Sequence, residues 1–221
     1  MYDGRMAGPV ASRRPRRTQR ERREATRTAL LEATIACLVR DGYANTTTRG
    51  IADRAGVSPG ALQHHFTSKT ELVSEASRHL MIELSQEMMQ KAPPADLPLL
   101  VRAEQVFRRI WEIHKGPPMQ AAMELSIAAR TDPELRDSLI AVERDTSAMV
   151  AAVGARLYPE VAGHAGFAEL AATAFAAMRG LALLGYVHPD VRDRVWPGTL
   201  AHLMRLTADL ERGNQVRGCI S

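Results

Sequence analysis

One short segment of the sequence, around residue 63, concentrates side chains that can recognise the edges of nucleic-acid bases. Gln63 can hold an adenine edge through two hydrogen bonds, and Ala61 can contact a thymine methyl group. His64 or His65 can donate a hydrogen bond to a phosphate or to guanine. The chemistry that these types predict is recognition of a DNA surface.

Residues placed at expected helix starts extend this set. A hydroxyl, an ammonium group and free backbone N–H groups at a helix N-terminus all suit phosphate, and Thr47, Thr48 and Lys69 occupy such positions. The predicted DNA-binding residues are Thr47, Thr48, Ser58, Pro59, Gly60, Ala61, Gln63, His64, His65 and Lys69.

Two short helices must position these side chains. Thr47 can cap the first, and Gly56 is placed to end it in the left-handed conformation. Ser58 can cap the second, with Pro59 in the first helical position, where its missing N–H costs nothing. The apolar residues that would form a small core between them are Ile51, Ala52, Ala55, Val57, Leu62 and Phe66. Such a pair is typical of a helix-turn-helix, whose second helix lies in the major groove; the plain alternative is an αα-hairpin that only packs.

Longer helices are predicted on both sides of this pair. Leu31, Ile35 and Leu38 follow helical spacing from residue 21 onward, and Gly42 is placed to end that helix after Asp41. Downstream, Ser68 and Glu71 have the spacing of a capping box, in which each side chain reaches the other's backbone N–H. This box predicts a long helix to about residue 91 that tethers the first three helices to the remainder.

Positive charge is concentrated at the start of the chain. Residues 1–70 hold 13 Lys and Arg against 6 Asp and Glu, whereas the rest holds 16 against 19. Residues 1–20 have no apolar period, so we expect an Arg-rich arm that is disordered when free. Such asymmetry favours a polyanion-binding segment, because Lys and Arg supply most nonspecific affinity for nucleic acid; a solvated basic tail is the alternative.

The remaining sequence predicts further helices. Helix-breaking stretches at 92–98, 117–118, 132–133, 159–166 and 188–189 leave five segments of about 14 to 25 residues each. Aromatic residues make up only 5% of the chain, and the composition favours helix over sheet. We therefore predict an all-α protein of about nine helices, with an arm (1–20), a three-helix DNA-binding domain (21–67) and an effector-binding and dimerisation domain (68–221).

The first part of this pattern resembles the TetR family of regulators. The matching elements lie between Leu31 and Leu72 and are Asp41-Gly42-Tyr43, Thr47 to Ile51-Ala52, Ala55-Gly56-Val57-Ser58, Gly60-Ala61-Leu62, His65-Phe66, and Ser68-Lys69 with Leu72. Two positions depart from the usual pattern: Gln63 stands where the family commonly has a tyrosine on a phosphate, and Gly50 weakens its helix by about 1 kcal/mol against Ala. The resemblance implies that helices four to seven enclose a ligand cavity and that the last two helices form a homodimer's four-helix bundle.

Residues in the second half are consistent with both implications. Met adapts to irregular ligands, and an indole with an imidazole can orient one polar group, although each of these side chains is also an ordinary core residue. The predicted ligand-binding residues are Phe107, Trp111, His114, Met119, Met123, Met149 and Met178. The segment from 167 to 187 is apolar on two faces, which predicts burial against a second subunit; a single interior helix of a monomer is the alternative. The predicted dimer residues are Phe167, Leu170, Ala174, Met178, Leu181, Leu203, Leu206 and Leu210.

Several other classes of protein are disfavoured. The sequence has no nucleophile elbow, phosphate-binding loop or zinc-protease motif, so we expect no enzyme and no cofactor. The histidines outside the His64-His65 pair fall on separate segments, which predicts no metal site. The 167–187 stretch contains Glu169 and Arg179 and is read as a bundle helix, not a membrane span. Cys37 should be a reduced, buried thiol, distant from Cys219, which is typical of a cytoplasmic protein.

These patterns together predict a DNA-binding transcriptional regulator that responds to a ligand. We expect a homodimeric repressor on a palindromic DNA operator, released by a small apolar or amphipathic effector, with no membrane partner. The alternative is a nonspecific architectural DNA-binding protein, in which the Arg-rich arm would supply most of the affinity.

Overall fold

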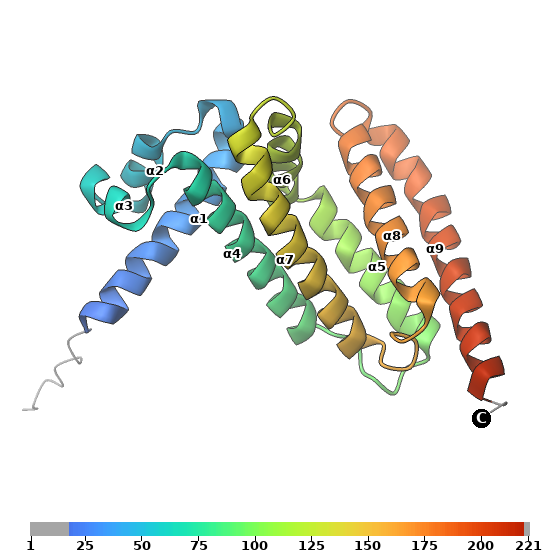
Figure 1. Cartoon of the computed structure of the whole chain (residues 1–221). Helices are drawn as coiled ribbons and strands as arrows, with labels where there is room; N and C mark the ends of the chain where they lie inside the picture. The colour runs from blue at the N-terminus through green and yellow to red at the C-terminus, as the bar shows by residue number, and fades with distance from the viewer. Residues whose placement is uncertain (1–17, 219–221) are drawn as a thin grey trace, which may run out of the picture.

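The computed structural model describes residues 18–218, with side chains to residue 213, and this part of the chain forms nine α-helices and no strand (Figure 1). The helices are α1 Gln19–Asn45, α2 Thr48–Ala55, α3 Pro59–His65, α4 Lys69–Gln90, α5 Leu99–Lys115, α6 Pro117–Ala128, α7 Pro133–Leu157, α8 Ala165–Leu184 and α9 Pro189–Gly218. The prediction of an all-α protein is confirmed.

Helix α1 begins two residues earlier than expected. Thr18 caps it, because its hydroxyl accepts from the backbone N–H of Glu21 while the Glu21 carboxylate accepts from the N–H of Thr18. Residues 18–20 therefore belong to the cap and first turn of α1, whereas the rest of the predicted arm, 1–17, lies outside the described residues. Near the other end, Gly42 has φ +73° and interrupts the helical dihedrals where a stop was expected.

The capping signals around α2, α3 and α4 act largely as predicted. Thr47, Ser58 and Ser68 each accept a hydrogen bond from the N–H three residues on. One detail differs: the Glu71 carboxylate accepts from the backbone N–H and the hydroxyl of Thr67, both at 2.7 Å, so the geometry is wider than the expected box. These hydrogen bonds hold the pKa of Glu71 below its usual value.

Five helices follow α4, as the breakers predicted, but two fall outside the expected lengths. Helix α6 has 12 residues and α9 has 30, since Pro197 is accommodated inside α9 without ending it. Helix α8 is long and apolar enough to cross a membrane by length and composition alone. In the structure it packs against α5, α6 and α9.

The buried side chains form three clusters. One joins α1, α2, α3 and the start of α4, and it contains Cys37, whose thiol is 2% exposed as expected; Cys219 lies outside the described residues. A second joins α1, α4, α6 and α7. The third and largest involves α5, α8 and α9, with contributions from the ends of α4 and α7. Figure 1 shows the α2–α3 pair projecting from one end of the molecule and the α8–α9 pair forming the other.

Candidate nucleic-acid interface and ligand cavity

The unit formed by α2, its turn and α3, residues 48–65 and here called the reading unit, is held by a small closed core. Ile51 and Ala52 are fully buried, and Leu62 and Phe66 are 3% and 2% exposed. Gly56 has φ +67° and ends α2 in the left-handed conformation that glycine adopts at no steric cost. The two short helices are therefore fixed relative to α1 and α4 by burial of apolar surface on their inner sides.

The outer side of the reading unit presents most of the predicted DNA-binding residues. Those that the structure leaves exposed are Thr47, Thr48, Ser58, Pro59, Gly60, Gln63 and His64. The Oγ atoms of Thr47 and Ser58 accept the capping hydrogen bonds, which leaves each hydroxyl hydrogen free to donate to an acceptor such as phosphate. Gln63 and His64 lie next to each other in sequence near the end of α3, on the surface that faces away from the core.

Three predicted residues are less accessible than expected, namely Ala61, His65 and Lys69. Ala61 is partly buried, and His65 packs against Phe66 at the edge of the small core. Burial lowers the pKa of His65, and the positive charges of Arg23 and Arg27 and the neighbouring His64 lower it further. His65 therefore stays neutral at a pH where a free imidazole begins to protonate.

Lys69 has a clear structural role in addition to any contact with phosphate. Its Nζ donates to the backbone oxygen of Tyr43 at 2.6 Å and lies 4.0 Å from the centre of the Tyr43 ring. Burial lowers the pKa of Lys69. The side chain therefore joins the end of α1 to the start of α4, whereas sequence reasoning placed it only towards DNA.

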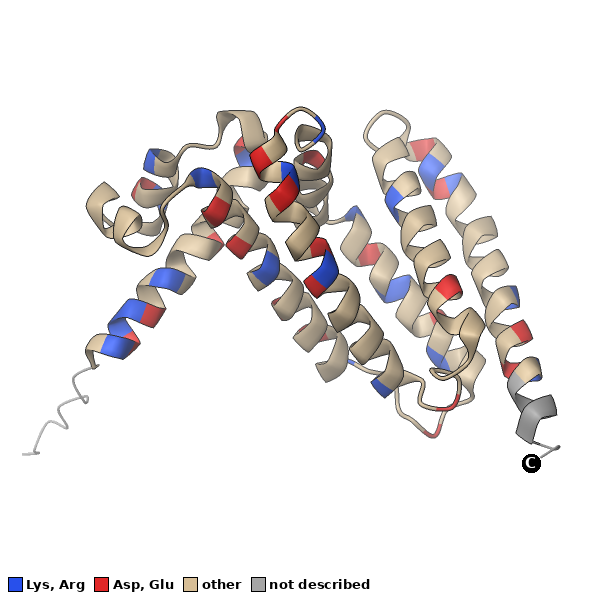
Figure 2. Cartoon of the chain, viewed as in Figure 1, with Lys and Arg blue, Asp and Glu red and all other residues tan. Residues whose placement is uncertain are grey.

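Sequence reasoning missed basic residues that the structure places beside this surface. Arg49 and Arg54 are exposed on α2, and Arg49 follows the predicted residue Thr48. Exposed arginines also cover the first half of α1, which gives that end of the molecule its positive charge (Figure 2). A cation in the first turn after a predicted N-cap is the signal that would have identified Arg49.

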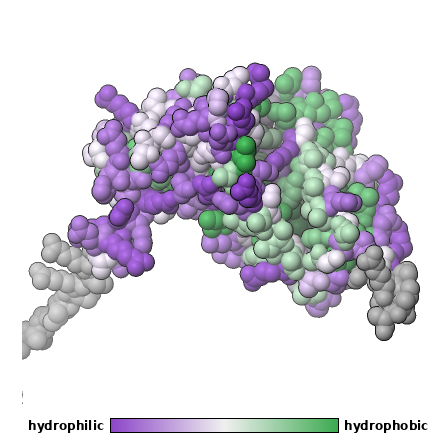
Figure 3. All heavy atoms as spheres, viewed as in Figure 1, coloured by the Kyte–Doolittle hydropathy of each residue, from purple (hydrophilic) through white to green (hydrophobic). Residues whose placement is uncertain are grey.

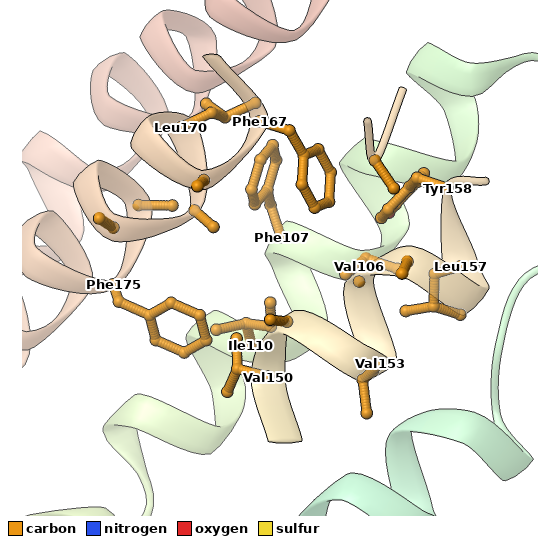
Figure 4. Close-up of a pocket in the computed structure, with 18 of the residues that line it drawn as sticks. Val106, Phe107, Ile110, Val150, Val153, Leu157, Tyr158, Phe167, Leu170 and Phe175 are labelled. Carbon is orange, nitrogen blue, oxygen red and sulfur yellow. The ribbon is translucent and has the colours of Figure 1, made fainter. Parts of the chain in front are cut away.

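A cavity of about 660 Å³ lies inside the other half of the molecule. Its walls come from α4, α5, α7, α8 and α9 and are mostly apolar. Figure 4 shows the rings of Phe107 and Phe167 beside each other, with Tyr158 on one side of them and Phe175 on the other. This size and lining are typical of a site for an organic small molecule.

The cavity opens towards solvent between α7 and α8. Lining residues on both helices are exposed, namely Ser147, Ala151 and Ala155 of α7 and Ala168, Ala172 and Ala176 of α8. Figure 3 shows apolar side chains around a hollow on this face of the molecule. Small side chains on both helices leave the entrance unfilled.

Polar groups are few and lie at defined points of the wall. Glu143 and Arg179 face each other across the entrance with 3.7 Å between a carboxylate oxygen and a guanidinium nitrogen. The Tyr158 hydroxyl donates to the backbone oxygen of Arg102, and burial raises the pKa of Tyr158 well above its usual value. The Ser85 hydroxyl lies 2.8 Å from the Met149 sulfur. An occupant would thus meet mainly hydrocarbon, with charges only at the mouth.

Only one of the seven predicted ligand-binding residues, Phe107, lines this cavity. Trp111 stacks on Trp196 with 4.5 Å between ring centres, and Met178 is fully buried in the core. Met119 is buried on α6, Met123 packs against the largest cluster, and Met149 contacts Ser85. The spacing of apolar residues along a helix identifies side chains that point inward but not which of them face a void.

His114 also lies apart from the cavity wall, 1% exposed and beside Phe175. Its Nδ1 is 2.8 Å from the backbone oxygen of Ile110, whereas its Nε2 has no hydrogen-bond partner among the described residues. Burial lowers the pKa of His114, an effect that the nearby Arg179 reinforces and the bond to Ile110 partly opposes.

The predicted dimer residues divide between the inside and the outside of one chain. Five are buried within the protomer: Leu170, Ala174, Met178, Leu203 and Leu210. Phe167 and Leu181 are partly buried against the same core, and Leu206 is 43% exposed. Most of the predicted dimer residues therefore face the core of their own chain. The sequence shows that a helix has two apolar faces, but not which of the two points inward. The large apolar side chains exposed on α8, α9 and their connection are Leu183, Leu184, Tyr186, Val187, Val195 and Leu206.

Comparisons with known proteins agree with this architecture. Residues 30–76 match the family described as bacterial regulatory proteins, tetR family. An uncharacterized HTH-type transcriptional regulator of Mycobacterium bovis is 34% identical over 151 residues, which cover 65% of this chain and 76% of that protein. A transcriptional regulator from Rhodococcus sp. Rha1 has the same fold, with a TM-score of 0.63 at 22% identity over 85% of this chain and 96% of the other. The multidrug binding protein EbrR, solved with proflavin, gives a TM-score of 0.53 at 21% identity over 84% and 99%. With its helix-turn-helix inside the matched segment, the chain belongs to the tetR family of DNA-binding bacterial transcriptional regulators.

Proposed function

We propose that the protein is a homodimeric repressor that binds a palindromic operator and releases it when a small apolar or amphipathic molecule occupies the cavity. The observation that carries this proposal is helix α4. It begins at the reading unit, where Ser68 caps it, and its second half supplies Leu84, Ser85 and Met88 to the cavity wall. One uninterrupted helix thus joins the surface that would bind DNA to the space that would bind a ligand.

Further contacts support coupling between these two sites. Helix α7, which forms part of the cavity wall, packs along α4, with a hydrogen bond between Ser74 and Ser138 and an ion pair between Arg78 and Asp145. A ligand that displaces α7 would therefore shift α4 and change the spacing of the two recognition helices in a dimer.

A second route connects α1 to α6. The backbone N–H of Tyr43 donates to the Glu124 carboxylate at 2.7 Å, and the Tyr43 hydroxyl donates to Asp132 at 3.3 Å. These bonds place the end of α1 against the start of α7 and the side of α6. The end of α1 is therefore held by elements of the ligand-binding half as well.

The homodimer rests on the exposed apolar side chains of α8 and α9 named above. An apolar surface of this kind is typical of an interface, and two copies related by a twofold axis would present two copies of α3 to DNA. The TetR-fold protein EbrR was solved with proflavin and with ethidium, which supports a role for the cavity in binding aromatic or amphipathic compounds.

Selection of bound sequences from a random duplex pool tests the DNA-binding part. We expect a palindromic sequence that binds two chains per duplex, measured by light scattering of the complex. A pool without enrichment would support the alternative, a nonspecific architectural protein whose affinity depends on salt but not on the DNA sequence.

The ligand-binding part is tested with the selected duplex. Apolar and amphipathic compounds are screened for those that release the protein from it, and the response is compared in two variants. Ala171→Trp fills the cavity and should keep operator binding while abolishing the response. Ala148→Trp adds the same side chain on an exposed position of α7 outside the cavity and should respond normally. An equal response in both variants would show that the effector does not bind in this cavity.

A further inference from the structure

Three side chains of metal-ligating type meet where α1 packs against α4. Glu32 comes from α1, and His79 and Glu83 come from α4, where a spacing of four residues places them on one face. One ligand atom from each, a carboxylate oxygen or an imidazole nitrogen, lies within 4.8 Å of the other two. Two helices that are far apart in the sequence thus bring three donors to one point.

The imidazole nitrogen at this point is buried and unsatisfied. The Nε2 atom of His79 has no hydrogen-bond partner in the part of the chain that the structure describes, although the ring as a whole is 21% exposed. Glu83 Oε1 lies 3.3 Å away, but the geometry does not form a hydrogen bond. A buried nitrogen without a partner is costly, and an ion is one of the few groups that can satisfy it.

The carboxylates of Glu32 and Glu83 differ from the other acidic side chains of α4 in their partners. Glu71 caps the helix start, and Glu75 and Glu87 form ion pairs with arginine or lysine. Within residues 18–213, Glu83 has no arginine or lysine within salt-bridge distance, and the same holds for Glu32. The two carboxylates beside this unsatisfied imidazole therefore form no ion pair with an arginine or lysine of the described residues.

We propose that Glu32, His79 and Glu83 form a binding site for a divalent transition-metal ion, best suited to zinc, that links α1 to α4. A tetrahedral zinc ion with ligands at about 2.0–2.2 Å separates neighbouring donor atoms by about 3.4 Å. The distance between His79 Nε2 and Glu83 Oε1 is 3.3 Å, which is close to this value. Glu32 and Glu83 are exposed, so water can complete the fourth position. The imidazole ligand favours zinc and its neighbours over magnesium, which prefers oxygen ligands alone.

Such an ion would link α1 and α4, the two helices against which the reading unit packs. Helix α1 supplies much of the core on which α2 and α3 rest, and α4 continues to the cavity. A bond through the ion fixes how these two helices cross. Sequence reasoning predicted no metal site because it looked for histidines with short ligand spacing, whereas Glu32 and His79 come together only through the packing of α1 on α4.

Calorimetric titration of the metal-free, tag-free full chain with zinc alone tests the proposal. We expect one zinc ion per chain at this site, with the affinity lowered at least tenfold in His79→Gln and lowered also in Glu32→Gln and Glu83→Gln. The matched control is His202→Gln, which removes an exposed histidine of α9 and should bind zinc as the original chain does. Magnesium should give no heat of binding at the same concentrations.

Thermal unfolding of the same proteins provides the second readout. A ligand that binds only the folded state raises the midpoint temperature, so zinc should raise Tm in the original chain and in His202→Gln but not in His79→Gln. Circular dichroism without metal establishes that His79→Gln is folded. The proposal is overturned if the original chain binds no zinc, or if His79→Gln binds and responds as strongly as the control.

Discussion

The reading unit and the half of the molecule that holds the cavity are both built from α-helices, but their functional surfaces lie in different places. In the reading unit, inward side chains such as Ile51 and Leu62 are almost fully buried between short helices, and the chemistry lies on the outside. In the other half, longer helices leave about 660 Å³ unfilled, and the chemistry lies within. A surface that reads DNA requires rigid positioning, whereas a site for an organic ligand requires apolar space at the expense of packing.

The largest effect is expected from truncation of one apolar side chain to alanine in each half. Leu62→Ala should lower the free energy of unfolding by about 2–5 kcal/mol, because Leu62 is 3% exposed and its truncation leaves a cavity in the small core. Val150→Ala in the cavity wall removes a partly buried side chain that already borders a void, and it should cost less than about 1.5 kcal/mol. Urea denaturation measures both, and equal losses would show that the two halves are packed alike.

The junction between the halves is tested at Gly42. Its φ of +73° disfavours any side chain, and a Cβ there would lie 2.5 Å from Glu124 Oε1, the atom that accepts the hydrogen bond from Tyr43. Gly42→Ala should destabilise the fold by about 1–3 kcal/mol. The control is Gly60→Ala, where φ is not positive and no atom lies within 4 Å, so stability should be unchanged or raised by up to about 1 kcal/mol. The comparison would fail if both variants had the same unfolding midpoint.

The outer face of the reading unit is tested by separating base contacts from phosphate contacts. Gln63→Ala should reduce discrimination at one operator position by about 1–3 kcal/mol, because an exposed amide on α3 can read one base. Arg49→Ala should weaken all duplexes equally and reduce the salt slope by about 1, since a guanidinium on α2 would contact phosphate. Competition binding against single-base operator variants at several salt concentrations distinguishes them, and the opposite pattern would mean a different docking of α3.

The cavity half is also tested through the pH dependence of stability. Burial lowers the pKa of His114 from its usual 6.5, so in mildly acid solution the unfolded chain binds a proton that the folded chain does not. The free energy of unfolding should therefore fall as pH drops below about 6.5, by up to about 1.4 kcal/mol per pH unit from this group. His114→Gln should flatten that slope between pH 6.5 and 5, measured by urea denaturation, whereas His202→Gln on the surface should leave it unchanged. The same slope in all three proteins would assign the acid sensitivity to other groups.

Local signals account for most of the first domain. Thr47 and Gly56 determine where α2 begins and ends, and Ser58 determines where α3 begins, because a cap or a left-handed residue acts through neighbours within a few positions. The exposure of Gln63 and His64 also follows from the spacing of Leu62 and Phe66. Lys69 shows the limit of such reasoning, since its partner Tyr43 is 26 residues away.

Sequence alone therefore determined the helical class, the boundaries of most helices and the outer surface of the reading unit, all of which depend on interactions within a few turns. Only the tertiary structure decided which sides of α5, α7 and α8 face a void, which stripe of α8 is inward, and that Glu32 lies beside His79. Periodicity identifies an apolar face, but a cavity, a subunit surface and a core present the same apolar face. What distinguishes them is the distance to the next helix, which depends on every helix that packs between them.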